Sequence, residues 1–278
     1  MALHTIATRD IVRISGEGAH KLLNDTLTCR FDDSLAGIGR WFALLSSQGK
    51  VQVEGLVTRA DGAWWFDLDA GFVADFVRRM KLYRLRAKAE IEHMPTYRVL
   101  WSAATEAPDG DAIACRDERS PLLGTRYIVD WGDPPAGARD VPPDYAAARK
   151  AAGIPEKAAD FAGNEVFAHD IALDLNQGID FIKGCYIGQE VVSRMKHRGT
   201  ARRRPVIVSG IDAPAGTAVL ASGRDAGPIG QVVEGRAVAI LRLDRVTDLD
   251  AVTVAGRPVR LDLPAYATYR FGESPPED

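Results

Sequence analysis

The sequence KGCYIGQE at residues 183–190 gathers, in one short segment, residue types that can do chemistry. A glycine on each side of its central three residues allows the backbone positive φ angles or a close approach to a ligand. Val191 and Met195 then continue the chain at helical spacing. The segment is therefore predicted to be a loop that leads into a helix starting near Gly188.

The residues around Cys185 support two interpretations of this cysteine. A helix N-terminus and a neighbouring ammonium, here that of Lys183, both stabilise a thiolate. A small cysteine packed in a turn explains the same residue, and no Ser/His/Asp or Cys/His partner set is recognisable. Lys183, Gln189 and Glu190 leave a similar choice. Their donors and acceptors suit a polar heterocycle, and they equally suit a solvated helix start with an acid in its first turn.

A dense basic run follows the octapeptide, at Arg194, Lys196, His197, Arg198 and Arg202 to Arg204. Such a run is a solvated face, a contact for the anionic tail of a small molecule, or a contact for an RNA backbone. His169, Asp170 and Asp174 precede it, but a lone histidine with carboxylates is more often structural than metal-binding. We therefore expect no metal site, and the cysteines at 29, 115 and 185 lack the spacing of an iron-sulfur cluster site.

The composition bounds the class of protein. With 278 residues, 46% hydrophobic and a net charge of −3, the chain should form about two globular domains and lacks the basic excess of a general nucleic-acid binder. Three widely spaced cysteines argue against a disulfide framework or a zinc knuckle. Residues 1–14 do not resemble a signal peptide, and no segment approaches the ~20 apolar residues of a membrane span. We expect a cytoplasmic protein without a membrane partner.

Apolar periodicity divides the chain into three regions. Strands and helices mix in the first two, which we predict as α+β lobes at about 1–95 and 96–200, with strands at 11–15, 41–45, 51–58, 64–68, 88–93, 98–103, 112–116 and 126–129 and helices at 17–27, 72–84 and 144–152. Residues 132–143 are predicted to be an exposed excursion. After a boundary near residue 200, a domain at 201–278 should be a small β-barrel, with strands at 205–208, 218–221, 229–233, 237–243, 252–254 and 259–263.

Three segments carry a family resemblance. They are residues 164–200, which contain HDIALDLNQGIDFIKGCYIGQEVVSRMKHRGT, ISGEGAHKLLNDTLT at 14–28, and SSQGKV at 46–51. Together they closely resemble the YgfZ family of folate-binding proteins, relatives of the T-protein (aminomethyltransferase) of the glycine cleavage system. The resemblance implies an α+β fold in which two related, ferredoxin-like lobes and a C-terminal β-barrel form a three-lobed ring around tetrahydrofolate. It also implies a role in assembling or repairing iron-sulfur clusters, including those of tRNA-modifying enzymes.

The resemblance assigns roles to residues. The family motif carries over onto Lys183, Gly184, Cys185, Tyr186, Gly188, Gln189 and Glu190, with Cys185 as the functional thiol. Asp170 stands where relatives commonly have a Glu that binds the amino-pyrimidine edge of the pterin, whose adjacent N–H donors a carboxylate can accept. We therefore predict that tetrahydrofolate, or a one-carbon derivative of it, is bound by Asp170, Lys183, Gly184, Tyr186, Gln189, Glu190 and Arg194.

Two departures from the T-protein pattern limit this transfer. Val53-Glu54 occupy the place of two consecutive aspartates, one of which serves catalysis, and Thr28-Cys29-Arg30 replace Thr-Asn-Asp. We therefore predict a folate-binding accessory protein whose partners are iron-sulfur client enzymes or cluster-assembly proteins, and not a classical aminomethyltransferase. Two alternatives stay open: an aminomethyltransferase or demethylase that uses Glu54, and an RNA-binding module built on residues 194–204, although direct nucleic-acid binding is not our expectation.

Overall fold

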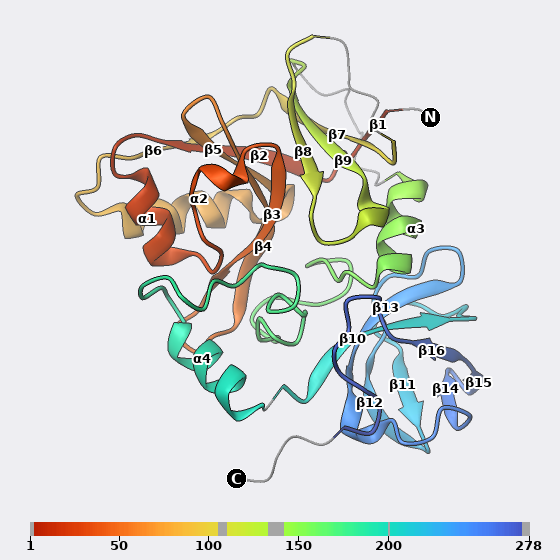
Figure 1. The fold of residues 1–278 in the computed structure, drawn as a ribbon. Coiled ribbons are helices and arrows are strands. Elements are labelled where there is room, and N and C mark those ends of the chain that lie inside the picture. The colour runs from red at the N-terminus through yellow and green to blue at the C-terminus, as the bar shows by residue number, and fades with distance from the viewer. Residues whose placement is uncertain (1–2, 105–109, 133–141, 200, 274–278) are drawn as a thin grey trace. The chain divides into compact units, whose positions relative to one another are not determined.

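The computed structural model describes residues 3–104, 110–132, 142–199 and 201–273 (Figure 1). Most of the predicted excursion at 132–143 lies outside these residues. The chain forms two compact units that interleave along the sequence. The first contains Met1–Leu44, Val53–Tyr145 and Gln177–Ile187, and the second contains Leu45–Gln52, Ala146–Asn176 and Gly188–Asp278. The domain boundary near residue 200 stays a prediction.

The first unit is built on a nine-stranded sheet with the order β1-β7-β9-β8-β3-β4-β5-β2-β6. Strands β3 and β8 run parallel, with Ile38 opposite Arg116, and this pairing joins the strands of the two predicted lobes into one sheet. The strands are β1 (His4–Thr5), β2 (Arg9–Ser15), β3 (Ile38–Leu45), β4 (Val51–Ala60), β5 (Ala63–Asp69), β6 (Glu90–His93), β7 (Tyr97–Ser102), β8 (Ile113–Asp117) and β9 (Thr125–Asp130).

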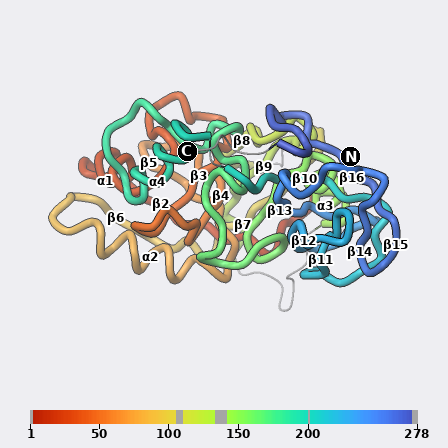
Figure 2. Tube along the Cα trace, turned by 90° about the horizontal axis from the view of Figure 1, so that it is seen from below, coloured from red at the N-terminus to blue at the C-terminus, as the bar shows by residue number. Residues whose placement is uncertain are grey.

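Two helices cover part of this sheet, α1 (Ala19–Thr26) and α2 (Ala70–Arg84). In α2, Val73, Phe76 and Met80 recur at helical spacing and are buried. The ring of Phe76 lies 5.3 Å from that of Phe66, centroid to centroid, in a core that α1 also enters through Leu22 and Leu23. Figure 2 shows the turn between α2 and β6 at one end of this unit.

The second unit contains the C-terminal strands. Its two sheets are β13-β10-β16, formed by β10 (Arg203–Ser209), β13 (Arg236–Arg242) and β16 (Arg260–Asp262), and β12-β11-β14-β15, formed by β11 (Ala218–Ala221), β12 (Arg224–Pro228), β14 (Val252–Val254) and β15 (Arg257–Pro258). They enclose one apolar core, to which Val206, Val219, Leu241 and Val254 contribute. The remaining helices are α3 (Pro143–Ala152) and α4 (Gln189–Arg198), with 3-10 turns at Asp33–Leu35, Pro121–Leu123 and Leu243–Arg245.

The predicted helices and most predicted strands are confirmed, but the strand at 229–233 is wrong. Ile229 forms an isolated bridge with Ala239, and the neighbouring strand is β12 at Arg224–Pro228. The backbone explains the difference, because the amide of Gly230 donates to Val238 O and that of Gln231 turns away to donate to Ala159 O. None of the helices in the described residues is both long and apolar enough to cross a membrane.

Candidate functional site

Lys183 holds the turn at residues 183–187 against the end of α1, within the first unit. Its Nζ donates to the carbonyl oxygens of Asn24 at 3.0 Å, of Cys29 at 2.7 Å and of Leu27. A helix leaves its last carbonyls without intrahelical partners, and a lysine ammonium has three protons to donate. The three protons are thus directed to the backbone at the end of α1 and not to the thiol of Cys185.

The surroundings of this ammonium are partly apolar. Its Nζ lies 4.7 Å from the ring centroid of Tyr186, a buried side chain. Burial lowers the pKa of Lys183 to about 8, against the opposing influence of Cys29 and Asp180, and burial also raises the pKa of Tyr186. The Lys183 ammonium and the Tyr186 ring therefore pack together on the inner side of the turn and fix its position.

Cys185 is the exposed cysteine of the chain, whereas Cys29 and Cys115 are buried. Burial raises the pKa of both Cys29 and Cys115 to about 12. Because the thiolate is the nucleophile and the metal ligand, neither buried thiol is available for chemistry. A Cβ added at Gly184 would meet nothing within 4 Å, so the backbone beside Cys185 is open as well.

Two sequence landmarks meet in the second unit, at the start of α4. Gly188 caps the helix with φ +80°, and a Cβ there would lie 2.6 Å from Ser46 O and 2.9 Å from the Leu45 Cβ. Gly49 has φ +76°, and a Cβ there would lie 2.8 Å from the Val191 Cβ. The hairpin turn of SSQGK thus packs against the helix that follows the octapeptide, and both glycines are required by this close approach.

The other predicted residues on α4 lie at its surface. Glu190 accepts a hydrogen bond from Arg194 Nη2 at 2.7 Å, and both side chains are exposed. Gln189 is half-buried beside them. An exposed pair at this spacing contributes little to stability, so these side chains remain available to a ligand at little cost.

Asp170 is a buried carboxylate in the second unit. It is 4% exposed, and its Oδ2 accepts a hydrogen bond from the Phe167 amide at 2.9 Å. Among the described residues, no cation lies within 4.0 Å of this carboxylate. Burial raises the pKa of Asp170 to about 6, opposed by the Phe167 hydrogen bond and by the charges of Arg203, Lys50 and Arg204. The carboxylate is thus mostly ionised at pH 7 without an ion-pair partner.

Lys50 lies in the same part of this unit. Its Nζ donates to Glu165 O at 2.9 Å and sits 3.3 Å from the ring centroid of Phe167. Burial lowers the pKa of Lys50, with Asp170 opposing that effect. This lysine, on the hairpin turn, was not among the predicted binding residues, although SSQGKV contains it. A cation, an aromatic ring and a buried carboxylate are therefore gathered in one place.

His169 and Asp174, which were considered above as metal ligands, instead lie beside Arg204. Arg204 binds Asp174 with both terminal nitrogens, at 2.7 and 3.0 Å, and also donates to His169 O. Burial lowers the pKa of His169. In the part of the chain that the structure describes, no three His, Cys, Asp or Glu side chains are grouped to hold a metal ion. Arg204, one of the residues of the basic run, thus forms an internal ion pair with Asp174.

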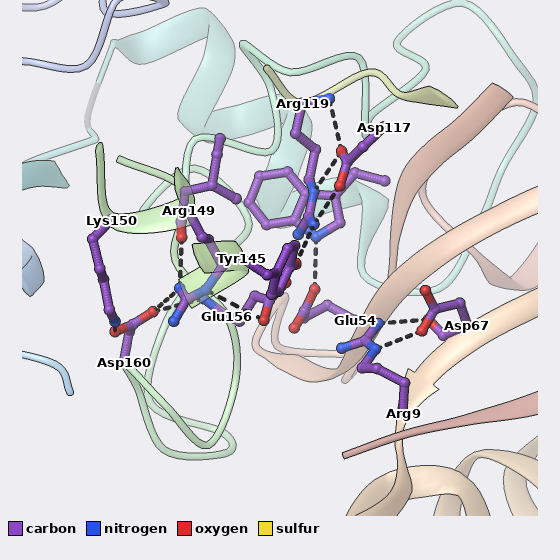
Figure 3. A network of polar contacts seen from close by, with 12 residues as sticks. Arg9, Glu54, Asp67, Asp117, Arg119, Tyr145, Arg149, Lys150, Glu156 and Asp160 are labelled. Atoms are coloured by element: carbon purple, nitrogen blue, oxygen red, sulfur yellow. Dashed lines mark hydrogen bonds and ion pairs between the residues drawn. The ribbon is translucent and has the colours of Figure 1, made fainter. Parts of the chain in front are cut away.

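A buried polar network in the first unit was missed by sequence reasoning (Figure 3). Asp67 accepts hydrogen bonds from Arg9 Nε at 2.5 Å and from Arg126 Nη1. Asp117 pairs with Arg119 at 2.7 Å in the same unit. These side chains lie on or beside strands, where alternating polar and apolar residues predict that the polar ones face solvent. No local signal in the sequence marks them as buried. Glu54 is also buried, and its Oε2 accepts a hydrogen bond from Trp41 Nε1 at 2.7 Å.

Comparison with known proteins places these features in a wider context. Residues 201–269 match the family model of the CAF17 C-terminal beta-barrel domain. A Neurospora crassa protein named "Iron-sulfur cluster assembly factor IBA57 homolog, mitochondrial" is 28% identical over 228 residues, 73% of this chain and 52% of the relative. Proteins of the same name from Phaeosphaeria nodorum (70% and 52%) and Mycosarcoma maydis (74% and 57%) are each 30% identical. The chain spans about half the length of the curated relatives it matches.

A solved structure confirms the fold class. The glycine cleavage system aminomethyltransferase T from Bartonella henselae superposes with a TM-score of 0.72 at 16% identity, over 97% of this chain and 87% of that one. The predicted α+β fold with a C-terminal β-barrel domain is thus confirmed. The expected cytoplasmic location is contradicted, because the relatives are named as mitochondrial. Cysteine usage indicates a reducing compartment and does not distinguish one such compartment from another.

Proposed function

We propose that this chain is an accessory protein of iron-sulfur cluster assembly that acts through the thiol of Cys185. The observation that carries the proposal is the exposure of Cys185, in a turn fixed from behind, while both other cysteines are buried. A thiolate can bind the iron of a cluster in transit only where a partner can reach it. The names of the relatives support this function, and iron-sulfur enzymes, tRNA-modifying ones included, are the proposed clients.

Within this proposal, the residues at 183–190 have different roles. Lys183 and Tyr186 hold the turn, so that the Cys185 side chain is presented and not packed away. Gly184 leaves open space beside the thiol, into which a partner protein can bring the iron of a cluster. The cluster is cargo in this scheme.

Replacing Cys185 by Ser should abolish this function while leaving the fold intact, because the side chain is exposed. In cells that lack their own homologous factor, the wild-type chain should restore the activity of an iron-sulfur enzyme, and Cys185→Ser should leave it at the level of cells without the protein. Ser47→Ala, an exposed change in the hairpin turn, serves as the control. Full restoration by Cys185→Ser would rule out a role for the thiol.

We also propose that tetrahydrofolate, or a one-carbon derivative, binds at Asp170. The fit rests on the donor set: a buried carboxylate that lacks a cation within 4.0 Å can accept the paired N–H donors of an amino-pyrimidine edge. Lys50 and Arg203 supply positive charge near that carboxylate. Gly184, Tyr186, Gln189, Glu190 and Arg194 remain proposed binding residues, and Lys183 fixes the turn that carries Gly184 and Tyr186. When bound, the cofactor would supply one-carbon chemistry.

Titration calorimetry with tetrahydrofolate tests this second proposal. Asp170→Asn should weaken binding by about 10- to 100-fold, because a charge-assisted hydrogen bond contributes about 1.5–3 kcal/mol. The exposed Asp212 provides the matched control, Asp212→Asn, which should bind like the wild type. Equal affinity of Asp170→Asn and wild type would remove Asp170 from the site, and absence of binding by the wild type would refute the folate proposal.

A further inference from the structure

The end of α2 and the turn after it carry a concentration of positive charge around two exposed leucines. Residues 78–88 include six Lys and Arg and no acidic residue. Leu82 is 62% exposed and Leu85 is 85% exposed. We call residues 81–88 the leucine turn. Figures 1 and 2 both show the chain between α2 and β6 projecting from the body of its unit.

Leu85 has a backbone conformation that is unfavourable for leucine. It is the C-cap of α2, with φ 45° and ψ −105°. A positive φ is strained for a residue with a Cβ and is the usual place of glycine at a helix end. Burial does not compensate this strain, since the side chain faces solvent. A strained, exposed leucine is the kind of residue that a binding function explains and folding does not.

The leucine turn is held rigidly by its backbone. Ala87 N donates to Arg84 O at 2.7 Å, and Gly18 N donates to Lys88 O at 2.9 Å. Arg84 Nη1 donates to Ala89 O at 3.3 Å. A Cβ at Gly18 would lie 2.8 Å from Lys88 N, so the turn also packs closely against the segment before α1. The leucine is therefore presented in a fixed position.

The charges around the leucines are only partly compensated. Lys81 and Arg86 are exposed, and within the described residues neither side chain has a hydrogen-bond or ion-pair partner. Lys88 pairs with Glu17 at 3.2 Å, but both side chains are more than 80% exposed, where such a pair contributes little. The surface therefore combines protruding apolar side chains with available positive charge.

We propose that the leucine turn binds the surface of membranes that contain anionic phospholipids. Leu82 and Leu85 would enter the interfacial region, and Lys81 and Arg86 would contact headgroup phosphates. The exposed leucines offer no ring on which a nucleic-acid base can stack, and the ring of Tyr83 packs against the apolar core of the unit. Protruding leucines need no complementary pocket in a bilayer. We expected no membrane partner because no segment can span one, but a peripheral contact requires no span.

Vesicle co-sedimentation with the full chain tests the proposal. The protein should pellet with vesicles of phosphatidylcholine and phosphatidylglycerol, and much less with phosphatidylcholine alone. Lys81→Glu with Arg86→Glu should weaken binding more than about 25-fold, since each lost charge near the surface accounts for about fivefold. Leu85→Gly should also weaken binding while leaving the unfolding temperature equal or higher, because glycine accepts the positive φ. Leu249→Gly, at a leucine 47% exposed elsewhere, is the control and should bind normally.

Several results would overturn the proposal. Recovery of the wild type in the supernatant with anionic vesicles at low salt would do so, and so would binding of Leu85→Gly as tight as that of the wild type. Binding to tRNA near physiological salt that is lost in the Lys81→Glu, Arg86→Glu variant but kept in Leu85→Gly would assign the surface to nucleic acid instead. A lower unfolding temperature for Leu85→Gly would show that folding, and not binding, accounts for this leucine.

Discussion

Replacing Asp67 by Asn should lower the free energy of unfolding by about 3–5 kcal/mol, the usual cost of breaking a buried ion pair by removing one partner. Asp67 is 2% exposed and lies between Arg9 and Arg126, which are themselves 6% and 0% exposed. Burial by itself raises the pKa of Asp67, but the two guanidinium groups outweigh it and hold the pKa below its ordinary value. Without the carboxylate, both buried arginines would lose its compensating charge, although Arg126 Nη2 would still lie 3.5 Å from Asp117 Oδ2.

Urea unfolding followed by circular dichroism measures this effect. The control is Asp75→Asn, which removes a partly exposed carboxylate paired with Arg78 and Arg79 on α2. Pairs that solvent reaches contribute about 0–1 kcal/mol, so the control should lose much less stability than Asp67→Asn. A loss below about 1 kcal/mol for Asp67→Asn would show that the network in Figure 3 does not stabilise the unit.

Local patterns predicted much of the fold because the periodic spacing of apolar residues in the sequence matches the positions that are buried in each helix or strand. In α2 the buried positions Val73, Phe76 and Met80 are apolar residues at helical spacing, and Gly188, the second glycine of residues 183–190, caps α4 where that helix begins. The ion pair of Arg9 with Asp67 was not predictable in this way. Its two residues are 58 positions apart, and a charged residue on a strand is ordinarily solvated.

The candidate site shows the same limit. Residue types predicted a loop and a helix start but left two interpretations of Cys185 open; the family resemblance pointed to it as the functional thiol, and the structure places it at the surface. The partners of Lys183 are backbone carbonyls more than 150 positions away, and carbonyl oxygens have no sequence signature. Lys50 was likewise overlooked, because its proximity to Asp170 depends on the pairing of Lys50 with Phe167. Tertiary pairing, and not residue type, gives these lysines their roles.

Replacing Asp170 by Asn should make the protein more stable at pH 7, by about 2–3 kcal/mol. Burial raises the pKa of this carboxyl to about 6, whereas an unfolded chain would have about 4. Each unit of difference corresponds to about 1.4 kcal/mol, which the folded state pays when the group ionises. Asparagine keeps an oxygen for the Phe167 amide and carries no charge. The same change is expected to weaken tetrahydrofolate binding, so stability and binding should move in opposite directions.

The pH dependence of this difference identifies its cause. Between about pH 4 and 6 the folded protein holds a proton on Asp170 that the unfolded chain has lost, so wild-type stability falls as pH rises through this window. Unfolding measurements on wild type and Asp170→Asn should therefore agree near pH 4, diverge up to pH 6 and stay apart above it. A less stable Asp170→Asn at pH 7 would mean that the carboxylate stabilises the fold. The expected result would instead leave a ligand as the physical reason for a buried charge at this position.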